Sequence, residues 1–159
     1  MDAAIAKQIE NHCLLLLARR EHSRLELLDK LALKGFSREA SLAVIEQLTA
    51  QGWQCDSRYA ESYARHRINR GFGPIAIAYE LNRNGITDID LEQVAQSVAG
   101  SWQAVLADVY QKKYHDDPPT DANDWAKRSR FLWQRGFPSG MVNTFLVGLH
   151  GRKFGSGKK

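Results

Sequence analysis

Arginine side chains are concentrated in two stretches of this 159-residue chain, and they are its residues best suited to bind a charged partner. In the first stretch, YARHRINRGFGP at residues 63–74, three arginines and a histidine fall within six positions. Guanidinium groups bind phosphates and carboxylates through paired N–H donors. A phosphate-binding loop would need a strand before its glycines and a lysine or serine behind them, and residues 71–74 have neither. The stretch is therefore predicted to be a corner between two helices.

The second basic stretch lies near the C-terminus, where residues 125–159 carry eight Lys or Arg and no Asp or Glu. Its candidate nucleic-acid-binding residues are Lys127, Arg128, Arg130 and Arg135. They are interleaved with aromatic residues, a pattern typical of proteins that hold single strands by phosphate contacts and base stacking. We expect the rings of Trp125 and Trp133 to pack in the helical core and the charges to face a partner.

Groups of residues that could perform catalysis are missing from the sequence. The five histidines show no metal-ligand spacing, and the two cysteines form no Cys-x-x-Cys pair. The adjacent acids Asp116 and Asp117 precede two prolines, a pattern typical of a turn. The sequence therefore predicts a protein that is not an enzyme and that uses no metal and no cofactor.

A repeated segment indicates which elements position the basic stretches. Residues 31–37, 81–87 and 132–138 share the pattern Leu-x-x-x-Gly-apolar-(Ser/Thr/Pro), and their glycines are separated by 50 and 51 residues. A glycine in the left-handed conformation commonly ends a helix, and the apolar residue behind it folds back on the last turn. Each copy therefore predicts a corner at which one helix ends and another begins.

Helix start signals complete the repeat. Ser23 with Glu26 has the pattern of a capping box, and Pro74 suits the first turn of a helix. Further start signals are Ser37, Asp56, Thr87 and Ser101. The predicted fold is all-α, an elongated curved solenoid of three tandem three-helix repeats. The repeats are expected at residues 1–54, 55–100 and 101–150, followed by a disordered basic tail at 151–159.

Composition limits the classes of protein to which this chain can belong. Apolar residues make up 43% of the chain and charged residues 25%, with a net charge of +4. No apolar run approaches the roughly 20 residues that cross a bilayer, and the polar N-terminus is unlike a secretory signal. We therefore expect a cytoplasmic monomer without a membrane segment, in which both cysteines are reduced.

Helical periodicity divides the arginines of residues 57–70 into two pairs. Arg58 and Arg65 are predicted to share a solvent-exposed face, whereas Arg67 and Arg70 fall on the apolar arc of the last turn. The first pair is therefore expected to contact a partner without holding the fold. The second pair suits structural and binding roles equally well.

In the order and spacing of its motifs, the chain resembles the RecX family of recombination regulators over about residues 10–150. The resemblance rests on Asp56-Ser57-Arg58-Tyr59, on Arg67 with Arg70-Gly71-Phe72-Gly73-Pro74, on Glu80-Leu81 with Asn84-Gly85-Ile86, and on residues 15–36 and 130–137. Family members commonly carry an acid at the position of Cys55. This departure concerns only a helix cap, which Asp56 can supply alone.

What the resemblance implies agrees with the helical repeats. RecX-like proteins are cytoplasmic, all-helical and built from three three-helix repeats. They bind the RecA recombinase filament along its groove, block its extension and promote its disassembly. They thereby inhibit its ATPase, strand-exchange and co-protease activities, and they also bind DNA. The expected partners are a RecA filament and, weakly and without sequence preference, single-stranded DNA. The candidate filament-binding residues are Arg58, Arg65, Arg67, Arg70 and Arg83.

Two other functions are compatible with the same sequence. Helix–Gly–helix corners also occur in free-standing DNA-binding proteins of the helix-turn-helix type, although no helix here carries base-reading residues beside a dimer interface. A generic scaffold of helical repeats for protein interactions is the other alternative. Whether DNA affects the binding of a partner would distinguish the scaffold from the other two.

Overall fold

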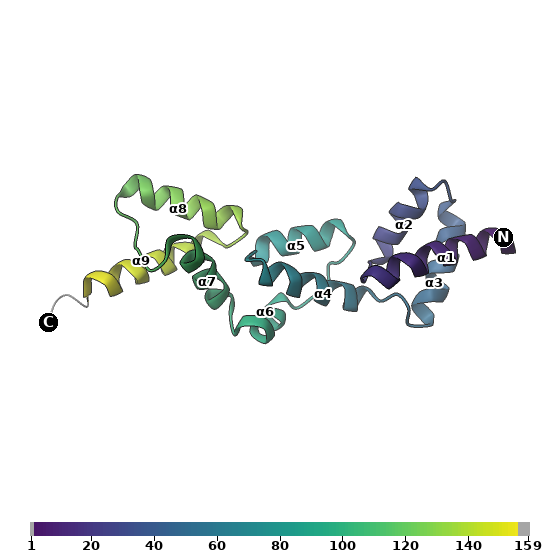
Figure 1. The fold of residues 1–159 in the computed structure, drawn as a ribbon, viewed down its shortest axis with the longest axis horizontal. Coiled ribbons are helices and arrows are strands. Elements are labelled where there is room, and N and C mark those ends of the chain that lie inside the picture. Colours follow the sequence, from purple (N-terminus) through teal and green to yellow (C-terminus); the bar gives the residue numbers. More distant parts are fainter. Residues whose placement is uncertain (1, 156–159) are drawn as a thin grey trace. The chain divides into compact units, whose positions relative to one another are not determined.

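The computed structural model describes residues 2–155, and every regular element in that range is a helix (Figure 1). The helices are α1 Ala3–Arg19, α2 Arg24–Leu33, α3 Arg38–Ala50, α4 Asp56–Asn69, α5 Pro74–Arg83, α6 Leu91–Ala99, α7 Trp102–Tyr114, α8 Ala122–Gln134 and α9 Ser139–Gly155. The all-α prediction is confirmed. Two compact units are present: unit 1 comprises Met1–Tyr63 and Leu81–Ile89, and unit 2 comprises Ala64–Glu80 and Asp90–Lys159.

Unit 1 is built on a hydrophobic core between α1, α2 and α3, which lie together in Figure 1. Its buried side chains are Ile9, Cys13, Leu27, Leu28, Leu31, Val44, Ile45 and Leu48. On each helix these residues recur at three- and four-residue intervals, so that one face is buried. The predicted capping box of Ser23 and Glu26 begins α2, and Ser37 caps α3. The local start signals therefore set the lengths of the helices that enclose this core.

α4 begins at Asp56, as the start signal predicts, but the carboxylate of Asp56 caps another helix. Its carboxylate accepts hydrogen bonds from the backbone N–H of Arg24 at 2.8 Å and from the side-chain amide of Gln54 at 2.9 Å. The first N–H groups of a helix have no partner inside that helix, and Arg24 is the first residue of α2. Asp56 thus caps α2 from 32 residues away and attaches the start of α4 to unit 1.

The start of α6 also differs from the prediction. Thr87 is not its N-cap: the helix begins at Leu91, and the side chain of Asp90 accepts a hydrogen bond from the backbone N–H of Gln93 at 3.1 Å. Aspartate is at least as good a cap as threonine, and the sequence offers Asp90 three positions further on. The loop between α5 and α6 is correspondingly longer than expected.

The three glycine corners are built as the repeat predicts. Gly35, Gly85 and Gly136 have positive φ angles of 89°, 84° and 97°. The N–H behind each glycine donates to the carbonyl of the leucine four positions before it, with Phe36 to Leu31 at 3.1 Å, Ile86 to Leu81 at 2.9 Å and Phe137 to Leu132 at 3.2 Å. The same leucines are buried. Each repeated leucine therefore supplies both a core side chain and a cap acceptor.

We expect Gly85→Val to lower the free energy of unfolding by roughly 1–3 kcal/mol, because a β-branched residue is strained at this positive φ. The new Cβ would also lie 3.1 Å from Cβ of Leu25. Gly35→Val is the matched variant, since its φ is equally positive but its surroundings are open. Urea unfolding followed by circular dichroism measures both, and an unchanged midpoint for Gly85→Val would contradict the corner geometry.

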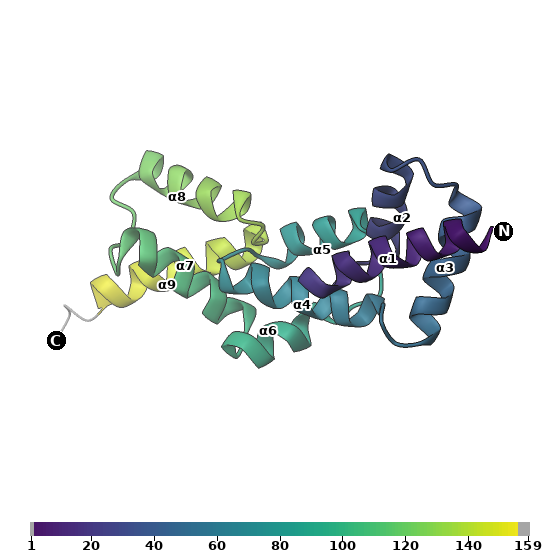
Figure 2. The same cartoon turned by 45° about the vertical axis from the view of Figure 1, so that its right-hand side comes forward.

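Unit 2 packs α7, α8 and α9 around a second core. The buried residues on these helices and on the corner between α8 and α9 include Trp102, Val105, Leu106, Tyr110, Leu132, Phe137, Val142 and Leu146. Figures 1 and 2 both show the chain turning back between α8 and α9, at the corner that contains Gly136. Ser101 caps α7 as predicted, with its hydroxyl oxygen accepting from the N–H of Ala104 at 3.0 Å.

Two corners of unit 2 contact each other directly through their backbones. The N–H of Gly73 donates to the carbonyl of Arg135 at 2.7 Å, and the N–H of Ile75 donates to the carbonyl of Gly136 at 3.0 Å. A Cβ on Gly73 would lie 2.5 Å from the oxygen of Gly136, and one on Gly136 would lie 2.6 Å from the nitrogen of Ala76. The segment Gly71–Pro74 is therefore a helix corner, as predicted, and its second glycine is needed because another backbone approaches it closely.

The C-terminal segment differs from the sequence prediction. α9 continues to Gly155, so residues 151–155 are helical where the sequence predicts a disordered tail. Residues 156–159 of that prediction lie outside the described residues. Between residues 2 and 155, no helix is long and apolar enough to cross a membrane.

Candidate functional site

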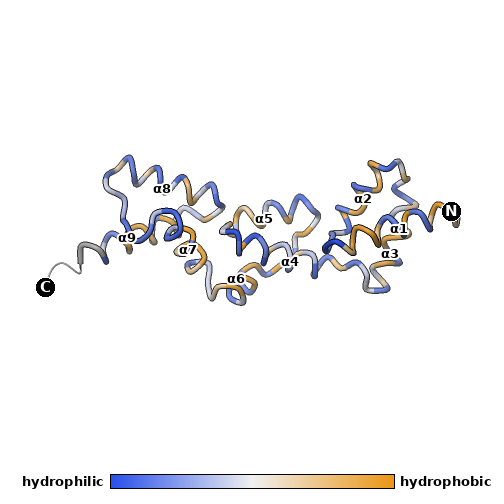
Figure 3. Tube along the Cα trace, in the orientation of Figure 1, coloured by the Kyte–Doolittle hydropathy of each residue, from blue (hydrophilic) through white to orange (hydrophobic). Residues whose placement is uncertain are grey.

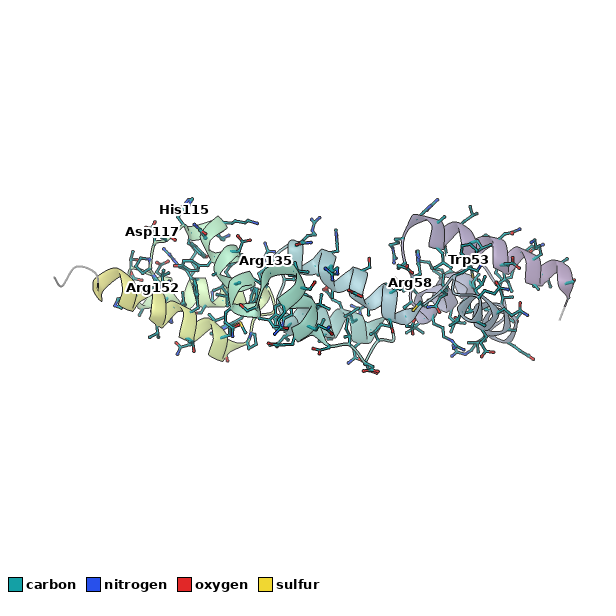
Figure 4. The ribbon with its side chains drawn as sticks, turned by 90° about the horizontal axis from the view of Figure 1, so that it is seen from below. Trp53, Arg58, His115, Asp117, Arg135 and Arg152 are labelled. Atoms are coloured by element: carbon teal, nitrogen blue, oxygen red, sulfur yellow. The ribbon has the colours of Figure 1, made fainter. Side chains whose placement is uncertain are left out.

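Arg58 is tied into unit 1 by three hydrogen bonds. Its guanidinium donates to the carboxylate of Glu21 at 3.0 Å and to the carbonyls of Gly52 at 2.8 Å and Trp53 at 3.3 Å. Figure 4 shows Arg58 beside Trp53 at the junction between α3 and α4. The expectation that Arg58 does not help to hold the fold is wrong, because the α3–α4 loop returns over the face that a helical wheel treats as solvent.

Arg65 is half-buried and belongs to unit 2. Its guanidinium donates to the hydroxyl oxygen of Ser97 on α6 at 3.0 Å. The predicted solvent-exposed position is therefore partly covered, because α6 packs near it. Both arginines predicted to lie on an open face therefore make a structural contact.

Arg67 joins α4 to α5 through a paired hydrogen bond. Its Nε and Nη2 donate to the two carboxylate oxygens of Glu80 at 2.8 and 3.0 Å, and both side chains are about three-quarters buried. The guanidinium carbon also lies 3.6 Å from the centre of the Phe72 ring. This geometry combines a charge-assisted fork with a cation–π contact and makes Arg67 a structural residue of the corner.

Arg70 is exposed, contrary to the helical-wheel prediction that it lies on the apolar arc. α4 ends at Asn69, so Arg70 follows the last helical residue and the wheel no longer describes its direction. The C-terminal part of α4 and this corner are largely hydrophilic in Figure 3. Arg83 is the last residue of α5 and is also exposed. Of the five candidate filament-binding residues, Arg70 and Arg83 present the most open side chains.

Arg128 holds the end of α7, the following loop and α8 together. Its guanidinium donates to the hydroxyl of Tyr110 and the carbonyl of Asp117, both at 2.7 Å, and it pairs with Asp124 at 3.0 Å. Burial by itself lowers the pKa of Arg128, but the bonds to Tyr110 and Asp124 outweigh burial and raise that pKa above its usual value. The side chain is only 12% exposed, so Arg128 offers a nucleic acid little surface.

Lys127 and Arg130 remain open on α8. Both are exposed, and within the described part of the chain neither has a carboxylate partner. The neighbouring tryptophans differ from the expectation that both are core residues: Trp125 is half-buried, whereas Trp133 is 48% exposed. Lys127, Arg130 and Trp133 are therefore the residues of this stretch that a partner can reach.

Arg135 belongs to a ladder of alternating cations and rings in unit 2. Its guanidinium lies 4.8 Å from the ring centre of Phe72, which Arg67 also contacts, and 5.5 Å from that of Phe131. The next cations of the ladder are Lys113 and Arg128. The ammonium of Lys113 lies 4.4 Å from the ring centre of Phe131, and the guanidinium of Arg128 lies 4.4 Å from that of Tyr114. Interleaved cations and aromatics are thus present as predicted. The rings are Phe72, Phe131 and Tyr114 instead of the tryptophans.

Lys113 is the residue of this ladder that sequence reasoning missed. It stands in residues 85–124, where eight acids outnumber two lysines, so a charge count over the segment hides it. Its place in the last turn of α7, one turn after the buried Val109, was the available signal. Among the described residues, no three His, Cys, Asp or Glu side chains are grouped to hold a metal ion.

Three family models match the chain in succession: "RecX, first three-helix domain" at residues 11–48, "RecX, second three-helix domain" at 56–94 and "RecX, third three-helix domain" at 103–146. The chain belongs to the RecX family. The prediction of three tandem three-helix repeats is thereby confirmed, and each RecX domain falls inside one predicted repeat.

Relatives agree with RecX membership, and two solved structures share the fold. "Regulatory protein RecX" of Pseudomonas syringae pv. tomato is 39% identical over 136 residues, covering 86% of this chain and 88% of that protein. "Regulatory protein RecX" of Pseudomonas fluorescens strain SBW25 is 39% identical over 133 residues, covering 84% and 86%. The crystal structure of RecX from Lactobacillus salivarius has a TM-score of 0.69 at 23% identity and covers 94% of this chain and 99% of its own. A second, titled "Crystal structure of regulatory protein RecX", gives 0.70 at 22%, covering 87% and 71%.

Proposed function

We propose that this RecX-family chain binds the filament of the RecA recombinase in its helical groove. There it blocks extension, promotes disassembly and so inhibits the ATPase, strand-exchange and co-protease activities. The observation that supports this best is the match to all three RecX domains in order, together with the "Regulatory protein RecX" relatives. The action is stoichiometric and non-catalytic, it takes place in the cytoplasm, and the protein acts as a monomer.

The side chains assigned to filament contact follow from exposure. Arg70 and Arg83 are exposed, whereas Arg65 and Arg67 are partly covered and Arg58 bonds to the α3–α4 loop. An arginine that keeps its internal bonds can still offer its outer N–H groups, so these three form a second set of contacts. Weak, sequence-independent binding of single-stranded DNA is assigned to Lys127, Arg130 and Arg135. Several weak contacts on one chain can sum to useful affinity.

The direct test is to add the purified protein to a RecA filament formed beforehand on single-stranded DNA and to follow ATP hydrolysis. Hydrolysis should fall as the protein approaches the concentration of the filament. A rate that stays constant up to saturating protein would contradict the proposal. Measuring binding to the same DNA without RecA separates filament regulation from a free-standing DNA-binding role, because a free-standing DNA-binding protein needs no recombinase.

Arg83→Glu tests the assigned contact. The variant should need about tenfold more protein for half-inhibition of ATP hydrolysis, which corresponds to about 1.4 kcal/mol, because charge reversal replaces attraction by repulsion. Arg38→Glu is the matched control, since Arg38 is also an exposed arginine at a helix end. Urea unfolding of both variants, compared with the parent, separates a lost filament contact from a loss of stability. Equal inhibition by the two variants would exclude Arg83 from the contact.

A further inference from the structure

The middle of the cation–aromatic ladder in unit 2 lacks the acids that neutralise its ends. Arg67 is paired with Glu80 at one end, and Arg128 with Asp124 at the other. Among the described residues, no carboxylate lies within ion-pair distance of the two middle cations, Arg135 and Lys113. The ladder therefore has two unneutralised positive charges at its centre.

Both middle cations line one groove. The groove has a volume of about 220 Å³ and lies between the α4–α5 corner, α7 and the end of α8. Its charged lining residues are Arg70, Asp108, Lys112, Lys113 and Arg135. Asp108 pairs with Lys112 at 3.0 Å, so three cations remain without a counter-ion. Like charges gathered at one small site repel one another, and a bound anion removes that repulsion.

The cations are held in place before any ligand binds. The Nη1 of Arg135 donates to the carbonyl of Arg70 at 3.0 Å, and its guanidinium rests against Phe72 and Phe131. The ammonium of Lys113 sits over the same Phe131 ring. Fixing donors in advance lowers the entropy lost when a ligand is bound.

The first glycine of the opening stretch keeps the groove open. Gly71 has a φ of 86°, and a Cβ there would lie 2.9 Å from Cγ2 of Val109 and 3.5 Å from Nη1 of Arg135. Any side chain at this position would therefore push on the groove wall and on its fixed guanidinium. The glycine serves both the helix end and the shape of the site.

The nature of the ligand follows from what the groove offers. Lys113 and Arg135 both lie against the Phe131 ring, so the groove presents cations to a ligand. A tetrahedral phosphate fits both the guanidinium fork and the ammonium group. We propose that this groove binds one backbone phosphate of single-stranded DNA, through Arg70, Lys113 and Arg135. The inference rests on the DNA-binding part of the proposed function and is independent of RecA inhibition.

The test measures binding of a fluorescein-labelled 30-mer of thymidylate by anisotropy over a range of salt concentrations. Lys113→Gln should weaken binding about fivefold at 0.1 M salt and reduce the slope of log K against log salt by about 0.7, the value for one phosphate contact on a single strand. Lys113→Gln with Arg70→Gln should weaken binding further, but the slope should fall by no more than about 0.7 in total, because both side chains contact the same phosphate. Lys34→Gln removes one positive charge from another exposed site, in unit 1. It should reproduce neither the fivefold loss of affinity nor the change in slope.

Each other outcome overturns the inference. If the parent protein binds the oligonucleotide and Lys113→Gln behaves like Lys34→Gln, the groove is not a phosphate site, while DNA binding and RecA inhibition stand. If the parent does not bind DNA but still inhibits the filament, the DNA-binding part of the proposed function fails with the inference. If inorganic phosphate protects Lys113 from acetylation and the oligonucleotide does not, the groove takes a free anion and not a DNA backbone.

Discussion

Gly136→Ala should lower the free energy of unfolding by about 3 kcal/mol or more. Two costs add at this position. An alanine is strained at a φ of 97°, and its Cβ would overlap the backbone nitrogen of Ala76, only 2.6 Å away, and the Cβ of the same residue. The corner cannot retreat without breaking the hydrogen bonds that Gly73 and Ile75 donate to it. Urea unfolding followed by circular dichroism gives the loss.

The control for this substitution lies in the next helix. Gly148 is within α9, and a Cβ added there meets nothing within 4 Å. Gly148→Ala should therefore stabilise the protein by up to about 1 kcal/mol, because alanine is the better helix former. Similar unfolding midpoints for the two variants would mean that the two corners of unit 2 do not touch as described.

Arg67→Ala should cost about 2–3 kcal/mol of unfolding free energy. The substitution removes the fork to Glu80 and the contact with Phe72, and it leaves a largely buried carboxylate without its main partner. A double-mutant cycle with Glu80→Gln should show a coupling of about 1–2 kcal/mol, because the two side chains touch. Both quantities come from urea unfolding curves of the four proteins.

An exposed ion pair provides the comparison. Arg24 pairs with Glu46 at 3.0 Å, but these side chains are 41% and 64% exposed. Arg24→Ala should cost less than about 1 kcal/mol, since solvent screens the pair. A loss for Arg67→Ala that is no larger than this would show that the α4–α5 corner does not depend on the buried fork.

Local patterns in the sequence were sufficient to predict the helices and their corners. Gly35, Gly85 and Gly136 end helices with positive φ, and Ser23, Ser37 and Ser101 begin them, because caps depend on residues only a few positions apart. The family resemblance, carried by the order of its motifs, was confirmed as well. Caps and corners are formed by residues close together in the chain, so they can be predicted from a single sequence.

The roles of individual charged residues could not be read in the same way. Asp56 caps a helix 32 residues away. Arg128 donates hydrogen bonds to Tyr110 and Asp117, which lie on other elements. A helical wheel assigns directions within one helix, so it also failed for Arg70, which follows the end of α4. Contacts between elements decide which cations remain available to a partner. The spacing of the cations along the chain does not show these contacts.

The borders of the sequence repeats and the borders of the compact units do not coincide. Asp56 of the second repeat caps α2 of the first, and Gly73 of the second repeat is bonded to the corner of the third. Exchanging a whole repeat with that of a relative would therefore separate residues that depend on each other, even where both parents are stable. A functional chimera would have to inherit Arg24 with Asp56, and Gly73 with Gly136, from the same parent.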